Sequence, residues 1–189
     1  ARPGDDVYVT GTVGAAAAGL RSLRADVATP GDADLVDCQQ RYLRPDPRLR
    51  AGHLLAAHRA ATACMDLSDG LADAARQVSA ASGVGMRLDA ELIPVPPRAR
   101  DLLAAHGWDP VQAAVAGGDD YELLFTARTT ARRRLRAVVR QLGDVPITRI
   151  GVVTREPAAV LRTPSGDRDL PSGFEHFRQD GALGPPPPG

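Results

Sequence analysis

The sequence of 189 residues contains no lysine, because all 23 of its basic residues are arginine. This absence excludes any mechanism that depends on a catalytic lysine. The acidic residues also number 23, so the formal net charge is zero. A neutral chain has no overall field to attract nucleic acid or an anionic membrane, and we expect neither as a partner. Binding partners must therefore be read from local clusters of residues.

Cysteine is scarce as well, since only Cys38 and Cys64 are present. Cys64 lies in an apolar run typical of a buried strand, so we do not expect a disulfide-stapled secreted scaffold. No apolar run approaches the ~20 residues of a membrane-spanning helix. The first residues also lack the pattern of a signal peptide. These absences favour a soluble, cytoplasmic protein.

Two further classes of site lack support in the sequence. The four histidines (His53, His58, His106 and His176) are scattered and form no ligand-like pair, so zinc is not expected. Ser68 has no histidine near it in the sequence, so a triad for acyl transfer is not indicated.

The length favours one compact domain that buries ~70% of its unfolded surface. We assign this domain to residues 1–183 and expect the proline-rich tail, Gly184 to Gly189, to be disordered. The chain has no initiator methionine and enters a strand almost at once, so we expect it to be a piece of a longer protein.

Alternating apolar patterns predict an α/β (α+β layered) domain, in which helices cover a mixed sheet. We predict strands at 7–10, 63–67, 85–89 and 121–127, and two closing strands, "ITRIGVVT" and "AAVLRT", around a short turn. We predict helices from the alanine run to about 23, at 50–59, from 71, and at 98–105, 110–116 and 129–142. Residues 29–40 are predicted to be a polar, turn-rich connector, and strand 121–127 to be central. The helix at 129–142 should bury Leu135, Val138, Val139 and Leu142.

The first acidic cluster is "DLSDG", with Asp66 at the end of a strand and Asp69 at the start of a helix. Two carboxylates at such a place could help to hold Mg²⁺, which usually takes one or two carboxylates together with phosphates and water. Gly70 would allow a phosphate to approach the free amides of the helix. The alternative is an ordinary helix N-cap at Asp69.

The second acidic cluster is "GGDDYEL", which places Asp119 and Asp120 side by side before a strand. A tight turn explains this arrangement, because the glycine pair frees the backbone and aspartate accepts hydrogen bonds from turn amides. A cation or a positively charged ligand between the carboxylates is the alternative. Spacing alone favours the turn.

Taken in order, "GDDVYVTGTVG", "RYLRPDPRLRAG", "MDLSDGLADA", "ASGVGMRLD", "AGGDDYELLFT" and "ITRIGVVT" resemble the second half of the thiamine-monophosphate kinase family. The likeness extends from Gly4 to about Phe177. This family is similar to aminoimidazole ribonucleotide synthetase, selenophosphate synthetase and a hydrogenase maturation enzyme. The resemblance implies ATP-dependent phosphorylation of thiamine monophosphate to thiamine diphosphate, with Mg²⁺ as cofactor. It also implies a homodimer for the full-length protein, with an N-terminal nucleotide-binding domain that this chain lacks.

The resemblance assigns roles by position. Asp66 and Asp69 match residues that hold Mg²⁺, and Ser68 matches a nucleotide contact. Asp119 matches a contact to thiamine monophosphate, and Phe174, in "GFEHF", matches an aromatic residue beside that substrate. Asp120 and Glu122 are expected to shape the start of the strand. Ala15 departs from the pattern, because relatives often carry aspartate there.

Three functional readings remain open from the sequence. The first is that the chain is a catalytic half that is inactive without the missing domain. The second is a non-catalytic ligand-binding fragment, and the third is part of another ATP-dependent synthetase of the same superfamily. A synthetase would share "SDG" but not "GGDDYELLF".

Overall fold

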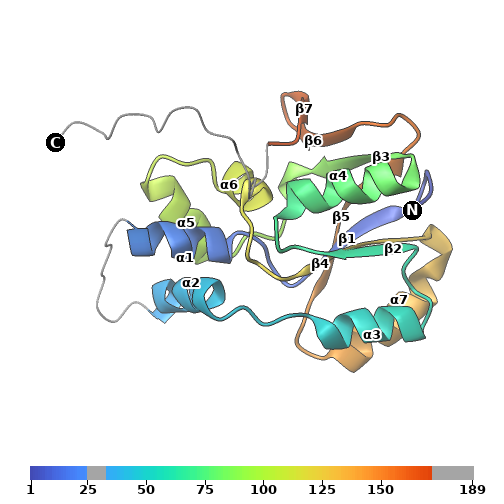
Figure 1. Ribbon diagram of the computed structural model, residues 1–189, viewed down its shortest axis with the longest axis horizontal. Coiled ribbons are helices and arrows are strands. Elements are labelled where there is room, and N and C mark those ends of the chain that lie inside the picture. Colours follow the sequence, from blue (N-terminus) through green and yellow to red (C-terminus); the bar gives the residue numbers. More distant parts are fainter. Residues whose placement is uncertain (25–32, 172–189) are drawn as a thin grey trace.

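The computed structural model describes residues 1–24 and 33–171, which form a mixed sheet with helices on both faces (Figure 1). The strands are β1 (Asp6–Thr10), β2 (Ala63–Asp66), β3 (Gly85–Asp89), β4 (Leu123–Ala127), β5 (Ile147–Thr154), β6 (Ala159–Thr163) and β7 (Gly166–Asp169). The helices are α1 (Ala15–Arg24), α2 (Ala33–Leu43), α3 (Leu49–Ala57), α4 (Leu71–Ser82), α5 (Pro97–Ala105), α6 (Pro110–Ala116) and α7 (Arg132–Leu142). The predicted α/β layered class is confirmed.

The order of the strands decides which loops become neighbours. The order is β2-β4-β1-β5-β3-β6-β7, and every neighbouring pair is antiparallel except β3 and β6. The chain therefore leaves β1 and β2 at the same end of the sheet at which it enters β4 and β5. We call this end the β1 carboxyl end. The loops that carry both acidic clusters lie there.

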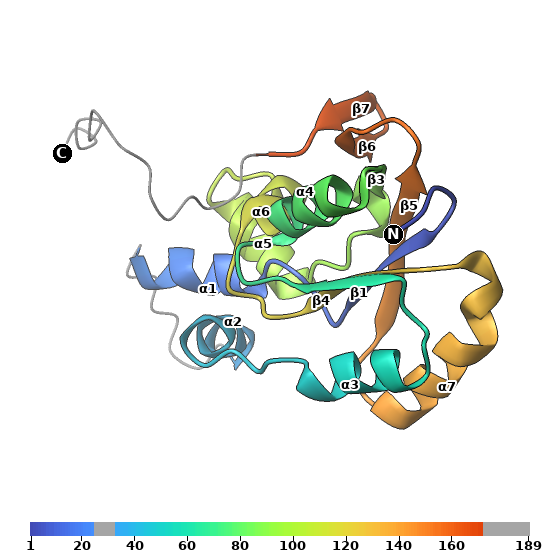
Figure 2. The same ribbon diagram turned by 45° about the vertical axis from the view of Figure 1, so that its right-hand side comes forward.

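Two apolar layers hold the helices against the sheet. Leu124 belongs to the layer that α1, α4, α5 and α6 cover, and its neighbour Phe125 belongs to the layer that α3 and α7 cover. Adjacent residues of a strand point to opposite faces, which explains this division. Figures 1 and 2 show α3 and α7 together on one side of the sheet and α4 on the other. In the part of the chain described, no helix is long and apolar enough to cross a membrane.

The prediction of a turn-rich connector at 29–40 is wrong for the residues that form α2. This helix packs against α1 and buries Leu35 and Cys38. The approach is close because Gly19 of α1 has no side chain: a Cβ there would lie 2.1 Å from the carbonyl oxygen of Cys38. Burial against a neighbouring helix outweighs the polar composition of this segment.

The expectation that Cys64 lies in a buried strand is also wrong. Strand β2 forms the edge of the sheet and Cys64 is exposed. Similarly, Val139 is 41% exposed, whereas Leu135, Val138 and Leu142 are buried as predicted. An apolar run shows that a segment can be buried, but the packing of its neighbours decides which side chains are covered.

The two closing strands were predicted around a short turn, but β5 and β6 are not neighbours in the sheet. Strand β3 lies between them and pairs in parallel with β6, with Leu88 opposite Leu161. Strand β7 was not predicted, and each of its residues is exposed. The predicted tail at 184–189 lies outside the described residues.

Candidate functional site

The "DLSDG" segment leaves the edge strand β2 and leads into α4. Asp66 is the last residue of β2 and is exposed, and Ser68 and Asp69 are partly buried in the loop. Helix α4 begins at Leu71, and its N-cap position is Gly70 rather than Asp69. The simple N-cap interpretation of Asp69 is therefore wrong.

The "GGDDYEL" segment lies directly beside this loop. The N–H of Asp119 donates to the carbonyl oxygen of Ser68 at 2.8 Å, and the N–H of Tyr121 donates to that of Leu67 at 3.2 Å. In return, the N–H of Leu67 donates to the carbonyl oxygen of Glu122 at 2.8 Å. Three backbone hydrogen bonds thus join the two acidic clusters, which lie about fifty positions apart in the sequence.

Backbone conformations in this loop are unusual for residues other than glycine. Asp119 has a φ of 66° and Tyr121 a φ of 50°, in the left-handed region that costs a non-glycine residue roughly 1–2 kcal/mol. Strand β4 accordingly begins at Leu123 instead of the predicted Tyr121. At Gly118 a Cβ would lie 2.5 Å from the carbonyl oxygen of Ser68, so the glycine allows the loops to meet.

Asp120 is buried and its side chain reaches the start of α1. Its carboxylate accepts hydrogen bonds from the N–H groups of Gly14 at 2.7 Å and Ala16 at 3.1 Å, at the start of α1. Burial raises the pKa of Asp120 to about 7, the two N–H donors act in the opposite direction, and the charge of Glu122 adds to the rise. A cation held between Asp119 and Asp120 does not fit this geometry, because Asp120 is occupied by the helix.

Glu122 is completely buried and receives several donors. The guanidinium group of Arg48 forms a bidentate pair with Glu122: Nε donates to Oε2 and Nη2 donates to Oε1, both at 2.8 Å. The hydroxyl of Thr10 donates to Oε2 at 2.7 Å, and Nη1 of Arg41 lies 3.6 Å from Oε1. Gly11 makes room for this carboxylate, because a Cβ there would lie 2.0 Å from Oε1.

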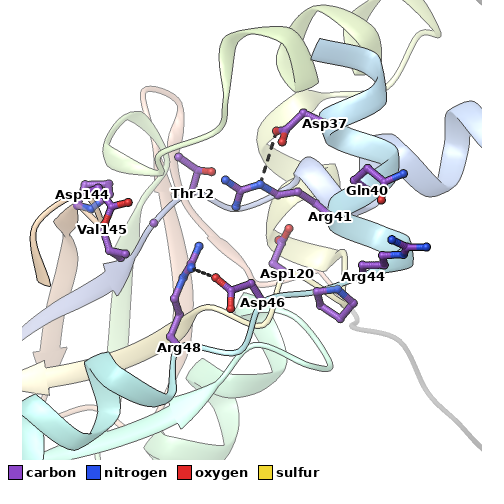
Figure 3. A pocket seen from close by; sticks show the side chains of 13 residues that line it. Thr12, Asp37, Gln40, Arg41, Arg44, Asp46, Arg48, Asp120, Asp144 and Val145 are labelled. Atoms are coloured by element: carbon purple, nitrogen blue, oxygen red, sulfur yellow. Dashed lines mark hydrogen bonds and ion pairs between the residues drawn. The ribbon is translucent and has the colours of Figure 1, made fainter. Parts of the chain in front are cut away.

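These arginines line a pocket of about 430 Å³ at the β1 carboxyl end of the sheet. Figure 3 shows Arg41 extending from α2 and Arg48 rising from the segment before α3, with Asp46 and Asp120 nearby. Arg48 also donates to Asp46 at 2.8 Å, and Arg41 lies 3.6 Å from Asp37. The pocket wall therefore carries charges of both signs, several of which are already paired.

The sequence did not assign a role to Arg48 or Arg41. A signal was available, because a glutamate that opens an apolar central strand needs a buried cation as its partner. The segment "RPDPR" stood among the motifs of the resemblance, but nothing in the sequence pairs it with Glu122. Ala15, where relatives often carry aspartate, is buried at the start of α1. It lies between Gly14 and Ala16, whose N–H groups donate to the carboxylate of Asp120. Phe174 lies outside the described residues.

Comparisons with known proteins identify the family to which the sequence is similar. The family model for the C-terminal domain of AIR synthase related protein matches residues 2–163. Thiamine-monophosphate kinase of Escherichia coli K12 is 39% identical over 184 residues, which cover 94% of this chain and 54% of that protein. The enzyme of Halobacterium salinarum is 40% identical over 139 residues, covering 74% of this chain and 43% of that protein. The chain thus spans about half the length of these curated relatives.

Solved structures show the same likeness. The crystal structure of thiamine-monophosphate kinase from Stenotrophomonas maltophilia K279a superposes with a TM-score of 0.77 at 36% identity, covering 85% of this chain and 51% of that chain. The structure of AaThiL complexed with AMPPCP and TMP superposes with a TM-score of 0.78 at 30% identity, covering 94% of this chain and 52% of that chain. Escherichia coli HypE, at 22% identity and a TM-score of 0.68, shares the fold. The chain therefore belongs to the family of the AIR synthase related C-terminal domain, and the curated relatives named above are thiamine-monophosphate kinases.

Proposed function

We propose that this chain is the C-terminal half of an enzyme that transfers the γ-phosphoryl group of ATP to thiamine monophosphate, giving thiamine diphosphate and ADP. The observation that carries the proposal is the hydrogen-bonded pairing of the "DLSDG" and "GGDDYEL" loops at one end of the sheet. Identity to thiamine-monophosphate kinases over 94% of the chain supports it, as does the likeness to AaThiL complexed with AMPPCP and TMP.

In this proposal the residues of the chain bind and orient, and none acts as a general base. The attacking phosphate oxygen is already ionised, so alignment and neutralisation of charge supply most of the acceleration. Ser68 contacts the nucleotide, and Asp119 contacts thiamine monophosphate together with Phe174. The hydrogen bond from Asp119 N–H to Ser68 at 2.8 Å supports this division, because it keeps the two binding residues adjacent.

Asp66 and Asp69 would hold Mg²⁺ in a site completed by the phosphates of the substrates and by ligands from outside this chain. In the described ranges no group of three or more His, Cys, Asp or Glu residues is placed to hold a metal ion. Mg²⁺ usually takes only one or two carboxylates and completes its shell with phosphates and water, and oxygen donors at the end of β2 suit that pattern. When bound, the ion would neutralise charge on the phosphates.

The remaining ligands would come from outside this chain, which covers 54% of the Escherichia coli enzyme. We propose that the other half is an N-terminal nucleotide-binding domain through which the full-length protein forms a homodimer, in the cytoplasm. Because transfer needs every group aligned at once, we expect the chain alone to show no measurable kinase turnover.

A chimera tests the proposal directly. This chain replaces the matching C-terminal 54% of the Escherichia coli enzyme, and formation of thiamine diphosphate from ATP and thiamine monophosphate is followed by chromatography. We expect turnover by the chimera and none by the 189-residue chain. The control is the chimera with Asp66→Asn and Asp69→Asn, which removes both proposed metal ligands.

Other outcomes would separate the alternatives. A folded chimera that binds thiamine monophosphate without turning it over would indicate a non-catalytic binding unit. A folded chimera that hydrolyses ATP only with a different acceptor would indicate a synthetase of the same superfamily. Turnover by the 189-residue chain itself, within tenfold of the Escherichia coli enzyme, would contradict the idea of an inactive half.

A further inference from the structure

The ion pair between Arg48 and Glu122 connects the pocket to the paired acidic loops. The carboxylate of Glu122 accepts hydrogen bonds from Nε and Nη2 of Arg48 and from the hydroxyl of Thr10. Nη1 of Arg41 lies 3.6 Å from the same carboxylate. The backbone of Glu122 is held as well, because the N–H of Leu67 donates to its carbonyl oxygen. One residue therefore joins the arginine wall to the "DLSDG" loop.

The neighbouring backbone depends on this anchor. Asp119 and Tyr121 both have positive φ values, three and one residues before Glu122. Non-glycine residues keep such conformations only where the surroundings hold them. The hydroxyl of Thr10 contributes twice, because it donates to Glu122 at 2.7 Å and accepts from the N–H of Leu123 at 2.9 Å. Glu122 and Leu123 are thus held by Thr10 at the point where the strained segment leads into β4.

We propose that Arg48, through Glu122, is a positioning residue that holds the Asp119 and Ser68 loops in register for phosphoryl transfer. The inference rests on the proposed function for its catalytic consequence. Its structural part concerns this chain alone and can be tested without any activity. Arg48 acts through Glu122, to which its Nε and Nη2 both donate.

The alternative is that the pair only stabilises the domain as a whole. Buried ion pairs often add little to stability compared with apolar residues of the same size, but removing one partner leaves an uncompensated charge. A general loss of stability would affect all slowly exchanging amides alike, whereas loss of positioning would affect the loop amides first. The two explanations therefore differ in a measurable way.

Amide hydrogen exchange in the 189-residue chain is the first measurement. The reporters are the N–H groups of Asp119 and Tyr121, which bond to the "DLSDG" loop, and the reference is Val153 N–H, which donates to Asp5 O at 2.9 Å in the sheet. We expect Arg48→Met to speed exchange at both reporters by at least tenfold more than at Val153. Glu122→Gln, which keeps the shape of the side chain, serves as the second variant if Arg48→Met does not fold.

Arg162→Met is the matched control. Arg162 also forms a two-pronged pair, with Asp167 at 2.8 and 3.3 Å, but both of these residues, on β6 and β7, are exposed. This variant should leave the exchange ratio between the reporters and Val153 unchanged. If Arg48→Met and Glu122→Gln accelerate the reporters no more than Val153, the positioning role is wrong.

Kinetics of the chimera are the second measurement. Arg48→Met should lower kcat at least tenfold and also raise the Michaelis constant for thiamine monophosphate, because the loop that it positions carries Asp119. Arg48→Lys should restore part of kcat because it returns the charge without the fork. Faster exchange at the reporters with unchanged kcat would overturn the catalytic consequence. An inactive parent chimera with the expected exchange pattern would instead count against the proposed function.

Discussion

The N–H group of Gly14 donates a hydrogen bond of 2.7 Å to the carboxylate of Asp120, which lies 106 positions later in the chain. With the second bond from Ala16, Asp120 serves as an acceptor for the free amides at the start of α1. Helix α1 has no acidic residue in its own first turn. A residue from the acidic loop therefore supplies what the local sequence lacks, and the position of α1 is tied to that loop.

The pKa of Asp120 predicts a dependence of stability on pH. Because burial raises this pKa to about 7 from 3.8, the folded state binds more protons than the unfolded state between these values. The contribution of Asp120 to stability should be complete below pH 4 and be lost as pH rises through 7. Each unit of pKa displacement corresponds to ~1.4 kcal/mol. Urea unfolding of the parent and of Asp120→Asn at pH 4, 6 and 8 measures the effect.

The Asn side chain keeps an acceptor but cannot ionise, so the parent should lose stability relative to the variant as pH rises. The two stability profiles would run parallel if Asp120 does not carry the titration.

Two glycines with similar backbones predict very different costs of substitution. Gly11 and Gly83 have φ values of 57° and 64°, but a Cβ at Gly11 would lie 2.0 Å from Glu122 Oε1, whereas nothing lies within 4 Å of one at Gly83. Gly83→Ala should cost ~1–2 kcal/mol for its backbone alone. Gly11→Ala should cost several kcal/mol, or prevent folding, because overpacking adds to the strain. Denaturation midpoints of both variants check this, and equal costs would mean that Glu122 can move aside.

Asp66→Asn should lower the rate of the chimera roughly a hundredfold or more, as expected when one electrostatic stabiliser of the transition state is lost. The amide is nearly the same size but lacks the charge that Mg²⁺ requires, so raised Mg²⁺ should restore part of the rate. Asp73→Asn is the control, because Asp73 lies nearby on α4 and bonds to Gln77. Steady-state rates over a range of Mg²⁺ concentrations provide the measurement. Unchanged kinetics at limiting Mg²⁺ would remove Asp66 from the metal site.

Asp119→Asn should raise the Michaelis constant for thiamine monophosphate roughly tenfold, which corresponds to the loss of one charged hydrogen bond. The Michaelis constant for ATP should stay within about twofold of the value for the parent. Asparagine is chosen because the φ of 66° at this position suits it better than alanine. Phe174→Ala should act in the same direction but more weakly, by ~1 kcal/mol for the lost contact with a ring. Paired saturation curves for both substrates in the chimera test the assignment. An equal loss of ATP affinity would place Asp119 at the nucleotide instead.

The sequence alone determined the class of the fold and the positions of most elements. Strand β3 and helices α5 and α6 fall where their apolar spacing and flanking prolines and glycines predict them, since these signals are local. The motifs also indicated the family, because their order along the chain is itself part of the sequence.

Tertiary structure decided which residues become partners. The position of α2 depends on close contact with Gly19, and the exposure of Cys64 depends on the place of β2 at the edge of the sheet. The hydrogen bonds from Gly14 to Asp120 and from Arg48 to Glu122 join residues 106 and 74 positions apart. No local pattern encodes such pairs, because a buried carboxylate requires a donor but its own segment does not specify which distant donor the fold will bring to it.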